Sequence, residues 1–116
     1  CSSDLTLMHM GGLAIVGSMQ PNNYIHVVFN NGAHDSVGGQ PTVGLDLDFS
    51  KIALACGYHA AFSVSDSDSL EMAIEDIKRM CGPVFLEIKV KKGARADLGR
   101  PTTSPIENKV AFMRQF

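Results

Sequence analysis

At 116 residues the chain is long enough for one domain with a modest core and too short for two. Its 45% hydrophobic and 19% charged residues are typical of a globular protein, and no apolar stretch approaches the roughly 20 residues needed to cross a bilayer. A net charge of −2 argues against a nucleic-acid partner, because proteins that bind phosphate backbones are usually basic.

The start of the chain and its cysteines give further expectations. The first residue is Cys1 rather than methionine and no signal-peptide pattern follows, so we expect residues 1–116 to be a single domain and a fragment of a larger chain. Cys1, Cys56 and Cys81 are far apart and lack the CxxC spacing of a zinc site. Cys56 and Cys81 each end an apolar helical segment, which predicts buried free thiols and a cytoplasmic protein.

The first two predicted elements are a helix over residues 5–19 and a strand over residues 24–29. Apolar residues roughly follow one face of the helical segment, and its glycines lower its helix propensity while permitting close approach of a neighbouring backbone. The segment YIHVVF is almost continuously apolar, which predicts a central strand covered on both faces. A long loop that contains several glycines, NNGAHDSVGGQPT, follows this strand directly.

Two further strands and a short helix are predicted after this loop. DFSKIALACG, residues 48–57, has the pattern of a short helix capped by Asp48 and ended by a glycine. The segments YHAAFSV (58–64) and VFLEIKVK (84–91) are predicted strands. The Gly-, Pro- and Thr-rich remainder is expected to be an extended tail that ends in a helix near ENKVAFMRQF.

Residues 68–82 have the clearest helical pattern. Asp68 and Glu71 have the spacing of a capping box, apolar residues line one face, and a Gly-Pro pair ends the segment. The resulting order of helix, strand, helix, strand, helix, strand predicts right-handed crossovers and a parallel sheet between helices. We therefore expect a three-layer α/β/α fold.

In such a sheet, ligands bind beyond the carboxyl ends of the strands, where the loop after residue 29 is expected to lie. Asparagine side-chain oxygens and backbone carbonyls are hard ligands that suit Mg²⁺ or Ca²⁺. An asparagine at a strand end, a carbonyl two residues on and a carboxylate would hold Mg²⁺ against a diphosphate. Asp4 begins the first helix, at the other edge of the same crevice.

Three segments carry a resemblance to a known family: LMHMGGLAIVGS, NYIHVVFNNGAHDSVGGQPT and DLGRPTTSPIENKVAFM. Together they resemble the diphosphate-binding domain of thiamine-diphosphate-dependent enzymes, in particular the phosphonopyruvate decarboxylases, over essentially the whole chain. The resemblance implies a thiamine diphosphate-binding fold with its first strand missing or truncated here. It implies thiamine diphosphate and Mg²⁺ as cofactors, with the side chain of Asn31 and the carbonyl of Ala33 as metal ligands.

The chain departs from the family at the Gly-Asp-Gly pattern, where it reads Ser2-Ser3-Asp4. An ungapped match places Ser3 at the position of the metal-binding aspartate, whereas a one-residue slip would let Asp4 serve. The candidate residues are Ser3, Asp4, Asn31, Gly32, Ser36 and Gly38 for cofactor binding, Asp4, Asn31 and Ala33 for the metal, and His34 and Asp35 at the catalytic centre.

The implied reaction is that of a carboxy-lyase, the decarboxylation of the small 2-oxo acid 3-phosphonopyruvate to phosphonoacetaldehyde. The family places the glutamate that activates the cofactor in a separate pyrimidine-binding domain, on the same or another chain, and the enzymes are homo-oligomers; the isolated chain is therefore expected to be inactive. Arg95 and Arg100 are candidates to pair with a phosphonate. Two alternatives remain open: a sulfopyruvate decarboxylase subunit, and a catalytically silent α/β module that binds a partner chain.

Overall fold

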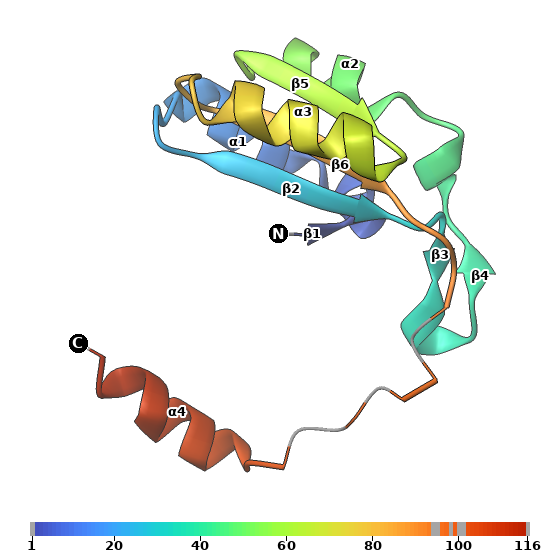
Figure 1. The fold of residues 1–116 in the computed structure, drawn as a ribbon, viewed down its shortest axis with the longest axis vertical. Helices are drawn as coiled ribbons and strands as arrows, with labels where there is room; N and C mark the ends of the chain where they lie inside the picture. The colour runs from blue at the N-terminus through green and yellow to red at the C-terminus, as the bar shows by residue number, and fades with distance from the viewer. Residues whose placement is uncertain (1, 94–95, 98, 100–101, 116) are drawn as a thin grey trace.

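The computed structural model describes residues 2–93, 96–97, 99 and 102–115. Figure 1 shows the order and arrangement of the elements. The strands are β1 (Ser2–Ser3), β2 (Ile25–Asn30), β3 (Ala33–His34), β4 (Gln40–Pro41), β5 (Ala60–Val64) and β6 (Val84–Lys89). The helices are α1 (Gly11–Met19), α2 (Phe49–Ala55), α3 (Ser67–Ile77) and α4 (Pro105–Met113), with three 3₁₀ segments, η1 (Asp4–His9), η2 (Asp35–Val37) and η3 (Val43–Leu45).

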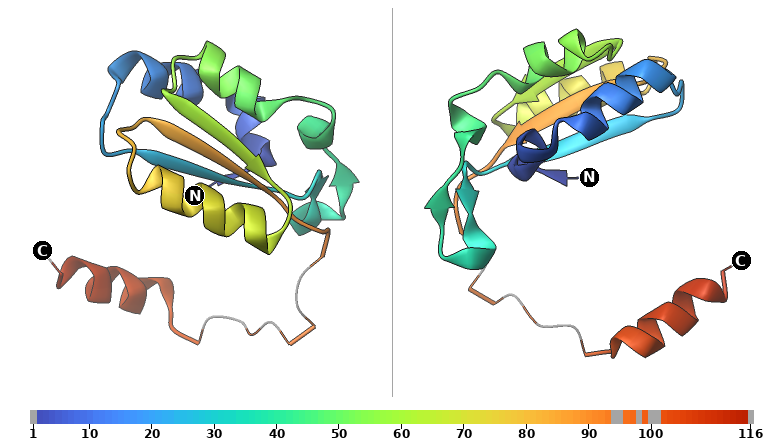
Figure 2. Two further views of the ribbon diagram at one scale, coloured as in Figure 1. Left: turned by 45° about the horizontal axis from the view of Figure 1, so that its top comes forward. Right: turned by 180° about the vertical axis from the view of Figure 1, so that it is seen from behind.

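The core of the fold is a parallel sheet with strand order β1-β2-β6-β5. Helices α1 and α2 cover one face of this sheet and α3 covers the other (Figure 2). This arrangement confirms the predicted three-layer α/β/α class. The first strand is present in the described residues as the two-residue β1, which pairs with β2. Strands β3 and β4 form a separate antiparallel pair within the loop that follows β2.

Each face of the sheet carries its own apolar cluster. On the face under α1 and α2 the buried residues are Leu13, Val28, Phe49, Ala53, Tyr58 and Phe85. On the face under α3 they are Val64, Ala73, Ile77, Val84 and Leu86. Because successive strand residues point to opposite faces, β6 alternates its side chains between the two clusters. Strand β6 is thereby buried on both sides.

The predicted central strand is covered less completely than its apolar pattern indicated. In β2, Ile25 remains 50% exposed and Phe29 44% exposed. The reason is that α3 packs over β5 and β6, and of β2 only Val27 joins the cluster below it. The prediction of burial on both faces is therefore wrong for β2. The prediction of a buried thiol is also wrong for Cys81, which is exposed, whereas Cys56 is partly buried.

The predicted helix over residues 5–19 is divided into η1 and α1, which meet at Met10. The consecutive glycines at 11 and 12 begin α1, consistent with their low helix propensity. Gly17 does permit a close approach: a Cβ there would lie 1.8 Å from the carbonyl oxygen of Cys56. The end of α2 therefore packs directly on the backbone of α1.

The helix caps agree with the sequence pattern in one case and differ in another. The Asp48 side chain accepts a hydrogen bond from the Lys51 N–H, which confirms the predicted cap of α2. At α3 the cap is Asp66 rather than Asp68, and it accepts from the Ser69 N–H at 2.9 Å. Asp66 has the extended backbone that an N-cap requires, whereas Asp68 already lies inside the helix.

The tail ends in α4, close to the position predicted for it. Ser104 and Glu107 form a reciprocal capping box at its start, and none of its described residues is buried. None of the helices in the described residues combines the length and the hydropathy needed to cross a membrane.

Candidate functional site

The carboxyl ends of β1, β2 and β6 bring the predicted site residues to one edge of the sheet. The strand register sets Ser3 beside Phe29 and Asn30 beside Lys89. The β3–β4 pair and η3 extend from this edge (Figure 1). Two consecutive asparagines at the end of β2, Asn30 and Asn31, occupy the centre of the region.

Asn30 is fully buried and makes four hydrogen bonds, which reach η3, β6 with the residue after it, and the loop that Asn30 itself begins. Its Nδ2 donates to the Glu87 Oε1 and to the Gly44 carbonyl, both at 2.6 Å, and its Oδ1 accepts from the Gly32 N–H at 3.0 Å. Its backbone carbonyl accepts from the Val90 N–H at 2.9 Å. Asn30 therefore fixes the start of the loop to β6 and to η3.

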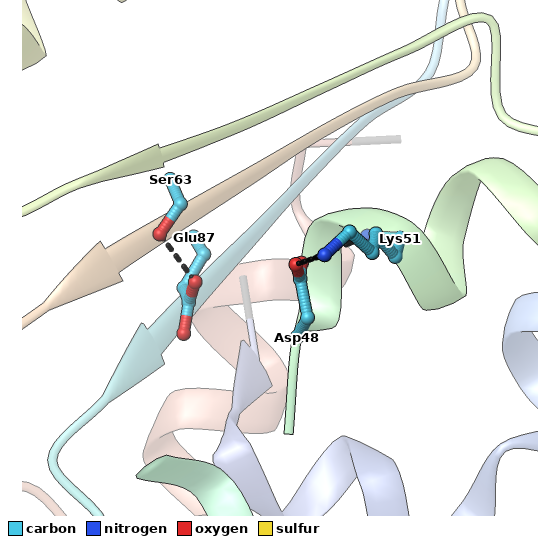
Figure 3. A network of polar contacts seen from close by, with 4 residues as sticks. All are labelled: Asp48, Lys51, Ser63 and Glu87. Atoms are coloured by element: carbon cyan, nitrogen blue, oxygen red, sulfur yellow. Dashed lines mark hydrogen bonds and ion pairs between the residues drawn. The ribbon is translucent and has the colours of Figure 1, made fainter. Parts of the chain in front are cut away.

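Glu87 is a buried carboxylate, 2% exposed, in the middle of β6. Besides Asn30 it binds Ser63 of the neighbouring strand β5, whose Oγ donates to the Glu87 Oε2 at 2.5 Å (Figure 3). Asn30 and Ser63 are both neutral, so these contacts compensate the carboxylate by hydrogen bonding alone. The same view shows the Asp48–Lys51 ion pair at the start of α2; hydrogen bonding to Lys51 lowers the pKa of Asp48.

Asp4 lies on the same side of the sheet edge as Asn30. Its carboxylate is 2% exposed, and its Oδ2 accepts a hydrogen bond from the Thr42 hydroxyl. A Cβ at Gly44 would lie 2.6 Å from the Asn30 Oδ1 and 2.8 Å from the Asp4 Oδ2, so glycine permits this packing. The Asp4 Oδ1 is buried and has no hydrogen-bond partner among the described residues. A buried acceptor without a partner is a place where a water or a cation fits.

Asn31 lies on the opposite side, in an open pocket of about 240 Å³. This pocket is lined by Ser3, Leu5, Phe29, Asn31, Ala33, His34, Asp35 and Val90. Successive residues of a strand point to opposite faces, so Ser3 and Asp4 separate in the same way as Asn30 and Asn31. The structure thus brings Ser3, Asn31 and Ala33 together, and it places the Asp4 carboxylate beside Thr42 and Gly44.

The Asn31 side chain is oriented by hydrogen bonds at both ends of its amide. Its Nδ2 donates to the Asp35 Oδ2 at 2.7 Å, and its Oδ1 accepts from the Ala33 N–H at 3.1 Å. The amide oxygen has two lone pairs, and this bond uses one of them. Asn31 therefore keeps an acceptor position for a cation.

The other predicted residues of the loop that follows β2 include two glycines and His34. Gly32 is buried with φ +62°, and Gly38 has φ +100°, so both adopt the left-handed backbone that favours glycine. His34 is half-buried and lines the pocket. The side chain of Ser36 and the residues Arg95 and Arg100 lie outside the part of the chain that is described.

The available oxygen atoms fit a hard cation better than a soft one. Among the described residues there is no group of three or more His, Cys, Asp or Glu side chains that could hold a metal. The amide oxygen of Asn31 and the carbonyl of Ala33, which lie together, are oxygen ligands of the kind that Mg²⁺ takes. The free oxygen of Asp4 is of the same kind but lies on the other side of the sheet edge. Magnesium commonly completes such a partial protein set with waters and substrate phosphates.

Sequence reasoning missed Asn30 and Glu87, the two residues that fix the loop to the sheet. A signal was present for Glu87, because it is a lone acid within the otherwise apolar run VFLEI. A charge at the centre of a buried strand needs a partner, and the polar residues of the neighbouring strands are the places to look for one. Asn30 gave no separate signal, since two adjacent asparagines at a strand end read equally well as one turn.

Comparison with known proteins identifies relatives. Residues 2–88 match the family "Thiamine pyrophosphate enzyme, C-terminal TPP binding domain". The chain is 39% identical over 101 residues, 87% of its length, to a phosphonopyruvate decarboxylase of Streptomyces viridochromogenes, and 38% identical over 101 residues to that of Streptomyces hygroscopicus. Over 52 residues it is 42% identical to a sulfopyruvate decarboxylase subunit beta of Methanocaldococcus jannaschii, covering 44% of the chain and 28% of that protein.

The chain spans about a quarter of the length of the Streptomyces relatives. The match covers the sheet, its helices and the loop that carries the asparagine pair. The carboxyl edge of the sheet, with its oxygen ligands, is where an α/β domain of this kind binds its ligand. By its fold and by its sequence, this chain belongs to the family of C-terminal thiamine pyrophosphate-binding domains of thiamine pyrophosphate enzymes.

Proposed function

We propose that this chain supplies the diphosphate- and Mg²⁺-binding domain of a carboxy-lyase that converts 3-phosphonopyruvate to phosphonoacetaldehyde and CO₂. The observation that carries the proposal is the open pocket at the carboxyl edge of the sheet, where Asn31 and Ala33 lie together. Support for the substrate comes from the two Streptomyces relatives, which are named phosphonopyruvate decarboxylases. When bound, thiamine diphosphate supplies the electron sink that decarboxylation of a 2-oxo acid needs.

In this proposal the side chain of Asn31 and the carbonyl of Ala33 hold Mg²⁺ at the diphosphate, and the free acceptor position of Asn31 supports this set. The Asp4 carboxylate, expected from the sequence as a third ligand, lies beside Thr42 and Gly44 on the opposite side of the sheet edge and is not part of this set. The positive φ of Gly32 allows the sharp turn between Asn31 and Ala33. The backbone near Ser3, Gly32, Ser36 and Gly38 would lie against the cofactor.

His34 and Asp35 are proposed to line the catalytic centre, as their place in the pocket favours. The groups that would accept or donate protons on the cofactor are expected in a pyrimidine-binding domain, on the same or another chain. The Methanocaldococcus relative is named as a subunit of sulfopyruvate decarboxylase, which supports a partner of this kind. We accordingly expect a cytoplasmic homo-oligomer, and no turnover by the chain alone.

Calorimetric titration of the chain with thiamine diphosphate and Mg²⁺, with and without the pyrimidine-binding part of a Streptomyces relative, tests the proposal. We expect binding heat that Asn31→Ala abolishes, with the variant folded by circular dichroism. Absence of heat from the folded wild-type chain in both settings would instead favour the catalytically silent partner-binding module. The feature that favours that alternative is Ser3, which places a hydroxyl in the pocket where the family pattern has a carboxylate.

The choice of substrate needs a separate measurement. The match to sulfopyruvate decarboxylase subunits favours sulfopyruvate as the alternative, because it is also a three-carbon oxo acid with an anionic head group. We expect the assembled enzyme to turn over phosphonopyruvate at a higher kcat/KM than sulfopyruvate. The reverse preference would assign the chain to the sulfopyruvate enzymes.

A further inference from the structure

Asp35 joins two segments that meet at the open pocket. Its Oδ2 accepts from the Asn31 Nδ2 at 2.7 Å and from the Gly93 N–H at 3.0 Å. Asn31 directly follows β2, and Gly93 belongs to the segment that follows β6. One carboxylate oxygen therefore holds the proposed metal ligand and the beginning of the tail together.

The bond to Asp35 determines which end of the Asn31 amide faces the pocket. A carboxylate only accepts hydrogen bonds, so the amide must turn its NH₂ group toward Asp35. The amide oxygen is then directed away from Asp35, where it accepts from the Ala33 N–H and keeps its second lone pair. Without Asp35, the Asn31 amide would be able to rotate and present its NH₂ group to a cation.

The neighbouring pair repeats this arrangement in the protein interior. Glu87 accepts from the Asn30 Nδ2, and the Asn30 Oδ1 accepts from the N–H two residues on, at Gly32. Each asparagine thus has a carboxylate on its nitrogen and a backbone N–H on its oxygen. In both cases a carboxylate accepts from the amide nitrogen, which indicates that the loop orients its two asparagine side chains in the same way.

A second contact supports the connection between the loop and the tail. The Lys92 Nζ donates to the Gly39 carbonyl at 3.2 Å. Lys92 directly precedes Gly93, whose N–H donates to Asp35. The segment between β3 and β4 is therefore attached to residues 92–93 at two points, Asp35 and Gly39.

Building on the proposed function, we propose that Asp35 is a positioning residue. It orients the Asn31 amide oxygen for the divalent cation and couples cation binding to the attachment of the tail at Gly93. Acids that act one bond away from a metal ligand commonly change metal affinity by 10–100-fold when removed, about the size of effect expected here. The role concerns binding and does not require Asp35 to touch the substrate.

The test measures Mn²⁺ binding to the full chain by electron paramagnetic resonance at saturating thiamine diphosphate. We expect Asp35→Ala to raise the Kd for Mn²⁺ by about 10–100-fold. Asp35→Asn should recover most of the loss, because one oxygen accepts both bonds and asparagine keeps one. Asp46→Ala is the matched control, since Asp46 is exposed and its carboxylate makes no hydrogen bond to another described residue.

Tryptic cleavage after Lys92 provides a readout that does not depend on affinity. In the wild-type chain, Mn²⁺ with thiamine diphosphate should slow this cleavage, and Asp35→Ala should remove the protection. Wild-type affinity in Asp35→Ala, an Asp35→Asn variant no better than Asp35→Ala, or cleavage insensitive to Mn²⁺ would each overturn the inference. If the wild-type chain itself binds no Mn²⁺, the proposed function fails, and this inference fails with it.

Discussion

The two sides of the sheet's carboxyl edge use the same residue types to different ends. On the side under α2, Asn30 uses both amide hydrogens and is fully buried with Glu87 and Asp4. On the other side, Asn31 uses one amide hydrogen and one lone pair for bonds to described residues and lines an open pocket. Two neighbouring asparagines with the same local turn therefore differ in what remains available to a ligand.

This difference assigns separate roles to the two sides. A saturated, buried amide contributes to stability, because its removal takes away the hydrogen bonds that Asn30 donates to Glu87 Oε1 and to the Gly44 carbonyl. A half-used amide on a pocket contributes little to stability, and in the proposed function it binds a cation. Under that proposal, folding and ligand binding are divided between adjacent residues of one strand end.

The comparison is tested most strongly by truncating each asparagine in turn. Asn30→Ala should lower the free energy of unfolding by about 3 kcal/mol or more, because it leaves a buried carboxylate partly unpaired. Asn31→Ala should cost less than about 1 kcal/mol, since its partners can bind water instead. Urea denaturation of the two variants beside the wild-type chain measures both values.

Binding should follow the reverse order. Asn31→Ala is expected to lose Mg²⁺-dependent binding of thiamine diphosphate while it remains folded, and calorimetry measures this loss. Equal destabilisation by the two substitutions would contradict the division of roles, because it would make Asn31 as much a part of the folded core as Asn30.

A carboxylate added to the open pocket should give a smaller but more specific effect, which is tighter binding of Mg²⁺. Ser3→Asp places a carboxylate in the pocket beside Asn31 and Ala33. We expect Mg²⁺ to bind about tenfold more tightly, or about 1.4 kcal/mol, because added ligand charge raises the affinity for a hard cation. Calorimetric titration with Mg²⁺ at saturating cofactor measures the change. Ser3→Asn is the neutral control of equal size, and equal affinities in the two variants would place the metal elsewhere.

The pattern of the sequence predicted the fold class and the location of the loop, and the reasons are local. The apolar runs at residues 24–29 and 84–91 and the helical period between them are properties of single segments, so they can be recognised without the fold. The cap at Asp48 follows in the same way from its neighbours. The loop after β2 was placed correctly at the carboxyl edge because that edge is the same for all strands of a parallel sheet.

The division between the two sides of the edge was not predictable from the sequence. It depends on the register of β1 against β2, and a shift of one residue would exchange the positions of Ser3 and Asp4. The Glu87–Asn30 bond joins residues 57 positions apart, so no local pattern contains it. The start of α3 was misplaced for a different reason, since Asp66 and Asp68 both suit a cap and only the backbone decides between them.

On the buried side, the negative charge of Glu87 should contribute less to stability than the size and the hydrogen bonds of its side chain. Its partners are a donor amide and a hydroxyl, and the Ser63 hydroxyl can accept a hydrogen bond as readily as it donates one. Glu87→Gln should therefore change the free energy of unfolding by less than about 1 kcal/mol. Urea denaturation near neutral pH measures it, with Asn30→Ala for scale. A loss as large as that of Asn30→Ala would mean that the charge itself is required.

The smallest expected effect concerns the other end of the same face of β2. His26 bonds the Tyr58 hydroxyl at 3.0 Å and packs on Phe85, and burial lowers the pKa of His26 below its ordinary value of 6.5. As the pH falls through 6.5, the unfolded chain takes up this proton before the folded chain does, so the free energy of unfolding decreases.

The melting temperature should therefore fall between about pH 7.5 and about pH 5.5, and His26→Gln should reduce that fall by removing the group that titrates. His59→Gln provides the matched control, because His59 is exposed and should leave the slope unchanged. The quantity compared is the slope of the melting temperature against pH in each variant. Loss of the bond to Tyr58 shifts stability at every pH, so it leaves this slope unchanged. An unchanged slope in His26→Gln would mean that the imidazole takes up its proton equally well in the folded and unfolded chains.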